Sequence, residues 1–572
     1  MSNPRTLLLI AGTFMVTGLV PVMAQPRGPA VPSISVRPPE QLRFRTTALT
    51  NLGWRLGTRS DSFGALAFRD AAIKADAATL PTIEGVSRNL DFNLTPAETA
   101  KVKATLAELR LRMSAYRLES MPGDEATRRK VFTFAKDLGA DMIITPADSA
   151  TLADLDKLAN EFAINVSVAA AKPASLMQAL EARSKRVGLD VSTANTSLSG
   201  LTALKDRVYS VTIAPGTKNV AQFLTQLSRV QPPNIQPDWP PTTDGGAKKS
   251  EVKPIFIELQ PAAGKDPVAD LSAAAATYDN DVRLAIAWRM DTLSRLSTIS
   301  TPNKLAADIR EKIDAAIPRQ ALVKPKKARK LLVMDLCVNG GYYHATIPQG
   351  NLAIELIGKH TGAYTPVFSN DMSNLRYPAI KQFDAVFLNN VEGEIFIDPE
   401  LMNGLLRYVR EGGGVAGLHA ATWASVDVPE YGELMGAQTG AHKYNGEPGT
   451  IRIEEPGTPL TAHFASKSFD VIDEFYHFLP GGPYSRDKLR ILISMDPTKT
   501  TLSGNQYTTR PDNDYGMVWI RSLGKGRVFN CALGHRPDFY QNPEMEKLLL
   551  AATQFILGDL EADATPSAQL KK

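Results

Sequence analysis

The stretch "DPELMNGLLRYVREGGGVAGLHAAT", residues 398–422, predicts a helix, a glycine-rich turn and a strand in immediate succession. The helix ends at the three glycines 412–414, because glycine is the residue that most readily leaves the helical conformation. A short apolar run follows, and it leads into a turn of small residues that carries His419. A helix that returns directly into a buried strand is the repeating unit of an α/β fold.

The same alternation extends over residues 329–558. Strand-like runs such as "KLLVMDLC", "FDAVFLNN" and "GRVFNC" are separated by amphipathic segments such as "GNLAIELIGKHTG". We therefore predict a doubly wound parallel sheet of the flavodoxin or amidotransferase type for this domain. In such sheets ligands bind beyond the carboxyl ends of the strands, which is where the turn with His419 falls.

Residues 43–299 form a separate series of helix–strand units. The segment "TPAETAKVKATLAELRL", for example, opens with a Thr-Pro-x-Glu helix start and is followed by the strand-like "RMSAYRLE". So many units in about 250 residues predict a closed (β/α)8 barrel. The whole chain is thus expected to be α/β, with a TIM-like barrel followed by a doubly wound domain.

The two ends of the chain and the segment between the two predicted domains differ in composition from the domains. Residues 1–24 combine an early Arg5, an apolar run and a small residue at Ala24, which is typical of a secretory signal peptide. A retained membrane anchor is the alternative. The other segments outside the two domains are expected to be a disordered lead, a linker and a disordered tail, at 25–42, 300–328 and 559–572. We expect a periplasmic or secreted protein with no stable membrane span after cleavage.

Composition excludes some classes of partner. The formal net charge of +4 is small and no basic stripe with interleaved aromatic residues is present, which argues against nucleic acid. Only two cysteines occur, Cys337 and Cys531, so the fold depends on its apolar cores. Whether these cysteines pair stays open, as does formation of a homo-oligomer.

The histidines point to the second domain as the site of any chemistry. All seven lie between His344 and His535, and none precedes them. Histidine is the side chain that titrates near neutral pH and a common metal ligand. We expect His360, at a helix end, to be structural, and His463 and His477 to be weaker candidates.

Residues 329–558 resemble the ThuA-like family, named for trehalose utilisation, which has a class I glutamine amidotransferase-like fold. The resemblance is carried by "YYHATIPQGNLAIELIG", "YVREGGGVAGLHAAT", "YGELMGAQTGAH", "DEFYHF" and "GKGRVFNCALGH". His419 stands at the turn where amidotransferases carry their nucleophilic cysteine, so glutamine hydrolysis is rejected. The positions that match the family's histidines are the candidate catalytic residues: His344, His419, His442 and His535.

Four further residues are candidates for substrate binding: Glu474, Tyr476, Arg527 and Trp423. Whether His344, His419 and His442 hold a divalent metal, zinc or a similar ion, stays open. Their wide separation in sequence lacks the short ligand spacing of zinc motifs.

Residues 43–299 resemble the sugar phosphate isomerase/epimerase family of xylose-isomerase-like barrels, at "IEGV", "RKVFTFAKDLGADMIITP", "LDKLANEFAINVSV" and "LKDRVYSV". That resemblance implies a divalent metal held at the strand ends. Glu84, Asp190 and Glu258 match, but the family's His-Asn-His is replaced here by Ala169–Ala171. We therefore expect a barrel without a working metal site, a pseudoenzyme kept for packing or sugar binding.

The family resemblance implies a carbohydrate as the small-molecule partner. We expect an exported protein, a lyase or hydrolase that acts on oxidised (3-keto) glycosides or disaccharides through the histidines of the second domain. A general base next to a ketone could remove a neighbouring proton and so release the glycosidic oxygen. The alternatives are a non-catalytic carbohydrate-binding or scaffold protein and, third, a sugar isomerase or epimerase.

Overall fold

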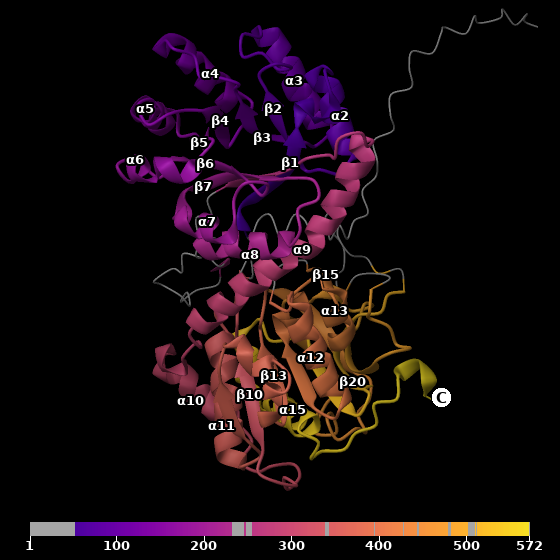
Figure 1. Cartoon of the computed structure of the whole chain (residues 1–572). Coiled ribbons are helices and arrows are strands. Elements are labelled where there is room, and N and C mark those ends of the chain that lie inside the picture. The colour runs from indigo at the N-terminus through magenta and orange to yellow at the C-terminus, as the bar shows by residue number, and fades with distance from the viewer. Residues whose placement is uncertain are drawn as a thin grey trace, which may run out of the picture.

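The structure is a computed structural model, and it describes residues 52–231, 245–246, 254–337, 342–393, 395–426, 428–442, 446–478, 482–500, 510 and 512–570. The predicted signal peptide, the predicted lead and the first residues of the predicted barrel, up to residue 51, lie outside the described residues. Figure 1 shows an N-terminal lobe and a C-terminal lobe joined by one long helix, α9.

The N-terminal lobe is a closed barrel of parallel strands, as predicted. Its strands, in order around the barrel, are β1 (Trp54–Arg59), β2 (Thr82–Val86), β3 (Arg112–Arg117), β4 (Met142–Pro146), β5 (Asn165–Ala169), β6 (Val187–Ser192), β7 (Val208–Ile213) and β9 (Ile255–Leu259). The barrel closes where β9 pairs in parallel with β1, Trp54 opposite Ile255.

Helices surround the barrel. They are α2 (Phe68–Ala77), α3 (Pro96–Glu108), α4 (Glu125–Asp137), α5 (Leu152–Phe162), α6 (Met177–Glu181), α7 (Leu198–Ala203), α8 (Val220–Val230) and α9 (Pro267–Leu296). The predicted start of α3 is confirmed, because Thr95 and Glu98 form a reciprocal capping box and Pro96 occupies the first turn. Local sequence therefore sets where this helix begins.

Helix α9 belongs to both lobes. One hydrophobic core cluster contains barrel residues, α9 residues such as Leu271 and Val282, and C-terminal residues such as Met372 and Leu375. Figure 1 shows α9 running from the side of the barrel down to the C-terminal lobe. The two lobes are therefore packed against each other through a shared apolar core.

The C-terminal lobe is built on a nine-stranded sheet with the order β12-β10-β13-β14-β21-β20-β19-β16-β17. Its strands are β10 (Lys330–Met334), β12 (Thr365–Phe368), β13 (Ala385–Asn389), β14 (Gly414–Leu418), β16 (Glu447–Ile453), β17 (Ser468–Asp473), β19 (Arg490–Met495), β20 (Gly516–Leu523) and β21 (Gly526–Cys531). Its helices are α11 (Ile347–Thr361), α12 (Pro399–Arg410), α13 (Pro429–Met435), α14 (Pro537–Tyr540) and α15 (Pro543–Ile556).

The predicted parallel sheet is confirmed for β12 through β21. The remaining strands pair antiparallel, so the sheet is mixed. The reason is visible between β20 and β21, which are joined only by Gly524 and Lys525. A two-residue connection reverses the chain, whereas parallel neighbours need a long crossover.

Two short pairings lie beside the main sheet. Strand β11 (Tyr342–Tyr343) pairs with β8 (Gly245–Gly246), and β15 (Thr439–Ala441) pairs with β18 (His477–Phe478). The first pairing joins a segment that precedes β9 of the barrel to the segment that carries His344. The first pairing thus precedes His344, and strand β15 of the second directly precedes His442.

Four expectations outside the sheets can be compared with the described residues. The linker contains helix α10 (Ala307–Ala316). The prediction of a disordered tail is wrong over 559–570, because Leu560 is buried and Ser567 N–H donates to the Leu489 carbonyl oxygen at 2.9 Å. Cys337 and Cys531 are free and buried. Among the described residues, no helix is both long and apolar enough to cross a bilayer.

Candidate metal centre at the carboxyl ends of the C-terminal strands

His419 occupies a constrained backbone position directly after the central strand β14. Its φ is +48°, in the left-handed region that non-glycine residues rarely adopt, and its side chain is fully buried. The Nδ1–H donates to the Ala532 carbonyl oxygen at 3.0 Å, which leaves the lone pair of a neutral imidazole on Nε2. That Nε2 lies 3.1 Å from the Glu474 carboxylate.

Three other histidines reach the same carboxylate from different segments. His344 follows β11, His442 follows β15 and His535 follows β21, whereas Glu474 follows β17. Their nitrogens lie 3.7 Å (His344 Nε2), 2.9 Å (His442 Nδ1) and 3.3 Å (His535 Nδ1) from the nearest Glu474 oxygen. The histidines that the sequence singled out therefore meet in one place, around a carboxylate that the sequence had suggested only as a substrate-binding residue.

One subset of this group has the arrangement of a metal centre. The ligating atoms of His344, His419, Glu474 and His535 all lie within 4.8 Å of one another, and all four residues are buried. Three imidazole nitrogens and one carboxylate oxygen suit zinc and related transition metals. Of the possible ligands His344, His419 and His442, the first two belong to this group, whereas His442 lies outside it and has a 31% exposed side chain.

Burial and contacts set the charges in the cluster. Burial lowers the pKa of His344 to about 4, so this imidazole is neutral at neutral pH, which is the form that binds a metal. Burial acts to raise the pKa of Glu474, but contacts with the surrounding imidazoles outweigh it and hold the pKa well below its usual range. The result is an anionic carboxylate among imidazole nitrogens.

An aromatic group covers one side of the cluster. The Tyr476 hydroxyl lies 3.1 Å from His419 Nε2, and its ring stacks on that imidazole with 4.6 Å between ring centroids. Trp423, which is half-buried, meets His442 edge-on at 5.7 Å. The His442 side chain is 31% exposed, against 0–5% for the other three histidines. His442 is therefore the most solvent-exposed of the four histidines around Glu474, whereas Tyr476 is buried.

Comparison with known proteins finds a family match for the C-terminal lobe. Residues 334–556 match the family model described as ThuA, trehalose utilisation. The C-terminal lobe is a ThuA-like domain. No curated protein matches the chain.

Solved structures are similar to one lobe or the other of the chain. A ThuA-like protein from Bacteroides uniformis has 17% identity and a TM-score of 0.35, over 43% of this chain and 98% of its own. A second ThuA-like protein, from Parabacteroides merdae, has 19% identity and a TM-score of 0.33, over 42% and 93%. A xylose isomerase-like TIM barrel protein from Mycobacterium smegmatis, solved with magnesium, has 11% identity and a TM-score of 0.32, over 41% and 98%. These likenesses concern the fold alone.

The remaining candidates lie away from the histidine cluster around Glu474. Arg527 is a correction: it stands at the start of β21, at the opposite end of the strand from His535, and its guanidinium lies 3.9 Å from Glu561. His360, which is expected to be structural, pairs with Asp314 at 2.6 Å. His463, a weaker candidate from the sequence, places its Nε2 2.8 Å from the Glu544 carbonyl oxygen.

Sequence reasoning missed two acidic residues of the ThuA-like domain. Asp473 is buried and accepts the backbone N–H groups of Glu474, Gly534 and His535 at 2.8–3.0 Å. Glu392 lies 3.9 Å from His344 Nδ1, and burial raises its pKa to about 8. The "DE" pair at the end of β17 was a signal for Asp473; nothing in the sequence pointed to Glu392.

Proposed function

We propose that the ThuA-like domain is a carbohydrate-processing lyase or hydrolase that acts on oxidised (3-keto) glycosides or disaccharides. One observation carries the proposal: His344, His419, His535 and Glu474 turn their ligating atoms toward one another at the carboxyl ends of the strands, within 4.8 Å. The family description, trehalose utilisation, supports a carbohydrate as the substrate class.

The residues present fit a divalent metal ion. His419 Nε2 carries a lone pair once Nδ1 donates to Ala532, and it faces the Glu474 carboxylate at 3.1 Å. Two electron-rich atoms at this distance repel unless a proton or a cation lies between them. His344, His419, His535 and Glu474 would hold the ion. When bound, such an ion supplies a Lewis acid that stabilises negative charge on a substrate carbonyl oxygen.

The chain's own residues supply the proton transfer. A ketone at C3 of a sugar acidifies the hydrogen at C2, and His442 is the imidazole of the group with the greatest exposure, so we assign it as the base. As the C2–H bond breaks toward His442, a C1=C2 double bond forms and the C1–O bond to the departing sugar breaks. The departing oxygen takes a proton from solvent. Trp423 and Tyr476 flank His442 and would pack against the sugar ring.

Two substitutions separate the two roles. His419→Ala should lose both the metal, measured by elemental analysis of the purified protein, and turnover of a 3-keto-disaccharide. His442→Ala should keep the metal and lose turnover by about 10²–10⁴-fold, the usual contribution of a general base. His360→Ala, a histidine of the same domain paired with Asp314, is the matched control and should change neither.

The two variants can contradict the assigned base and the proposed metal centre separately. Full turnover by His442→Ala would remove the assignment of the base, and full turnover by His419→Ala would remove the proposed centre. A wild-type protein that binds oxidised disaccharides without turning them over would instead be the non-catalytic carbohydrate-binding protein named as the alternative.

We also propose export to the periplasm or the medium. The proposal rests on Arg5, the apolar run 7–22 and the small residue Ala24. Mass spectrometry of the protein expressed with its own N-terminus should find a mature chain that begins at Gln25. An intact N-terminus in the cell's membrane fraction would favour the retained anchor.

A further inference from the structure

Three carboxylates meet at the mouth of the barrel, at the carboxyl ends of strands that are far apart in sequence. Glu84 lies on β2, Asp190 on β6 and Glu258 on β9, and their side chains are 0%, 11% and 2% exposed. A buried carboxylate is strongly disfavoured unless a cation or hydrogen-bond donors compensate its charge. The question is which group provides the positive charge here.

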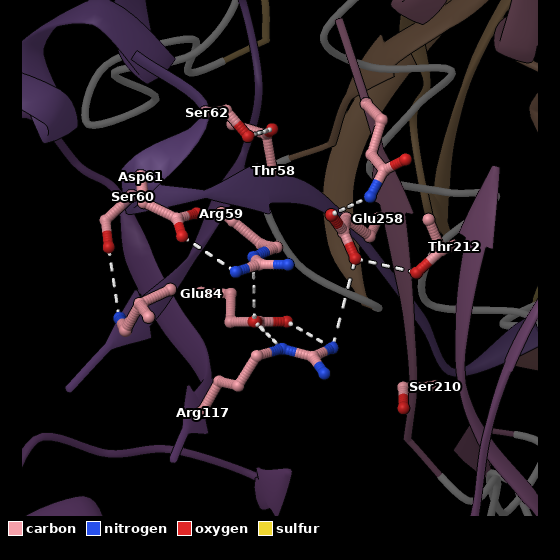
Figure 2. Close-up of polar contacts among 12 residues, drawn as sticks. Thr58, Arg59, Ser60, Asp61, Ser62, Glu84, Arg117, Ser210, Thr212 and Glu258 are labelled. Carbon is pink, nitrogen blue, oxygen red and sulfur yellow. Dashed lines mark hydrogen bonds and ion pairs between the residues drawn. The ribbon is translucent and has the colours of Figure 1, made fainter. Parts of the chain in front are cut away.

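That cation is a side chain of the barrel itself. Arg117, the last residue of β3, forms a two-pronged contact with Glu84, donates from Nη1 to Asp190 at 3.0 Å and brings Nη2 to 3.9 Å from Glu258. Figure 2 shows the Arg117 guanidinium beside Glu84 and reaching toward Glu258. The Arg117 side chain is 14% exposed.

Neighbouring strands supply further hydrogen-bond donors to the carboxylates of the cluster. Ser210 on β7 donates to Asp190 at 2.6 Å, and Thr212 donates to Glu258 at 2.7 Å. Arg59, at the end of β1, stands 3.8 Å from Glu84 (Figure 2). The carboxylates thus face donors from several strands, with one guanidinium in contact with all three.

We propose that the guanidinium of Arg117 is the resident cation of the barrel mouth, where it takes the place of a divalent metal ion and excludes one. A guanidinium and a hard divalent ion compete for the same carboxylate oxygens. Arginine stays charged in proteins and is tethered to β3, so a free ion has to displace a cation that does not leave. Among the described residues, the candidate metal centre is then the cluster in the ThuA-like domain.

The test is to remove this cation. In the full-length chain, Arg117→Met should bind one Mn²⁺ per chain more than the wild type, measured by titration calorimetry, because Glu84, Asp190 and Glu258 lose their common counter-ion. Arg117→Lys keeps the charge and should bind no additional ion. Arg112→Met is the matched control: this arginine lies on the same strand but pairs with Asp141 and is 50% exposed. The double variant with Glu84→Gln should bind the additional ion at least tenfold more weakly.

Any Mn²⁺ taken up by the histidine cluster is common to all these variants, so failure of this inference is distinguishable from failure of the proposed function. A folded Arg117→Met protein with no additional Mn²⁺ would overturn the inference. So would a wild-type protein whose Mn²⁺ uptake falls on Glu84→Gln. If Arg117→Met does not fold without metal, Mn²⁺ should raise its thermal unfolding midpoint more than that of Arg112→Met, and an equal response of the two would also overturn the inference.

Discussion

The carboxylate of Asp473 accepts the backbone N–H of His535 at 3.0 Å and so holds the turn after β21 against the end of β17. The same carboxylate accepts the N–H groups of Glu474 and Gly534. Two of the proposed metal ligands, Glu474 and His535, therefore have their backbones fixed by one buried side chain. This relationship makes Asp473 a positioning residue for the candidate centre.

Removing that side chain should affect both stability and metal binding. Asp473→Ala leaves buried N–H groups without an acceptor, and each such group costs about 1–3 kcal/mol of unfolding free energy. Metal affinity should fall by about 10–100-fold, the usual effect of losing an outer-shell partner. Urea unfolding and metal titration measure the two effects. Asp470→Ala, an exposed residue on the same strand, is the control, and an equal loss of affinity there would refute the positioning role.

The backbone at His419 predicts a difference between two loss-of-function variants. Because its φ is +48°, alanine keeps the left-handed strain and glycine removes it. His419→Gly should therefore be about 1 kcal/mol more stable than His419→Ala, although both should lack metal and turnover. Thermal unfolding of the two purified variants checks this. Equal stability would show that the turn is not strained.

Glu546 should make stability depend on pH. It lies in the first turn of α15, fully buried, and its carboxyl oxygens have no hydrogen-bond partner among the described residues. Burial raises the pKa of its carboxyl well above the usual value for glutamate. The folded state thus favours the neutral carboxyl. The contribution of this group to the unfolding free energy is fully present below the unfolded pKa. It is lost as pH rises toward the folded pKa, by about 1.4 kcal/mol per pH unit.

Glu546→Gln removes this dependence, because glutamine does not titrate. The unfolding free energy of the variant relative to the wild type should therefore increase steadily from pH 5 upward, as measured by urea unfolding at several pH values. Glu355→Gln, an exposed carboxylate on α11, should show a flat difference over the same range. A flat difference for Glu546→Gln as well would mean that its carboxyl is solvated or paired in solution.

The glycine at the start of β14 should be required for packing rather than for a turn. A Cβ on Gly414 would lie 2.0 Å from the Ile556 carbonyl oxygen of α15, which is backbone and cannot rotate away. Gly414→Ala should lower the unfolding free energy by about 3 kcal/mol or more. Gly123→Ala, where nothing lies within 4 Å of the added Cβ, should be close to neutral in the same urea titration.

The sequence by itself determined the order of helices and strands, because apolar periodicity, the Thr95 capping box and the glycines before β14 act over a few residues. It also placed the histidines at strand ends, since a residue's position after an apolar run depends on the local pattern alone. The parallel barrel and the parallel part of the second sheet follow from that order of elements.

Only the tertiary structure decided which side chains meet. Glu474 became the centre of the histidine cluster because β17 ends beside β14 and β21 in space, although β17 is the edge strand of the sheet. Arg117 became the partner of Glu84, Asp190 and Glu258 because closure of the barrel brings β3, β6 and β9 around one mouth. Such contacts join residues tens to hundreds of positions apart, and no local pattern records a distance between strands that only packing brings together.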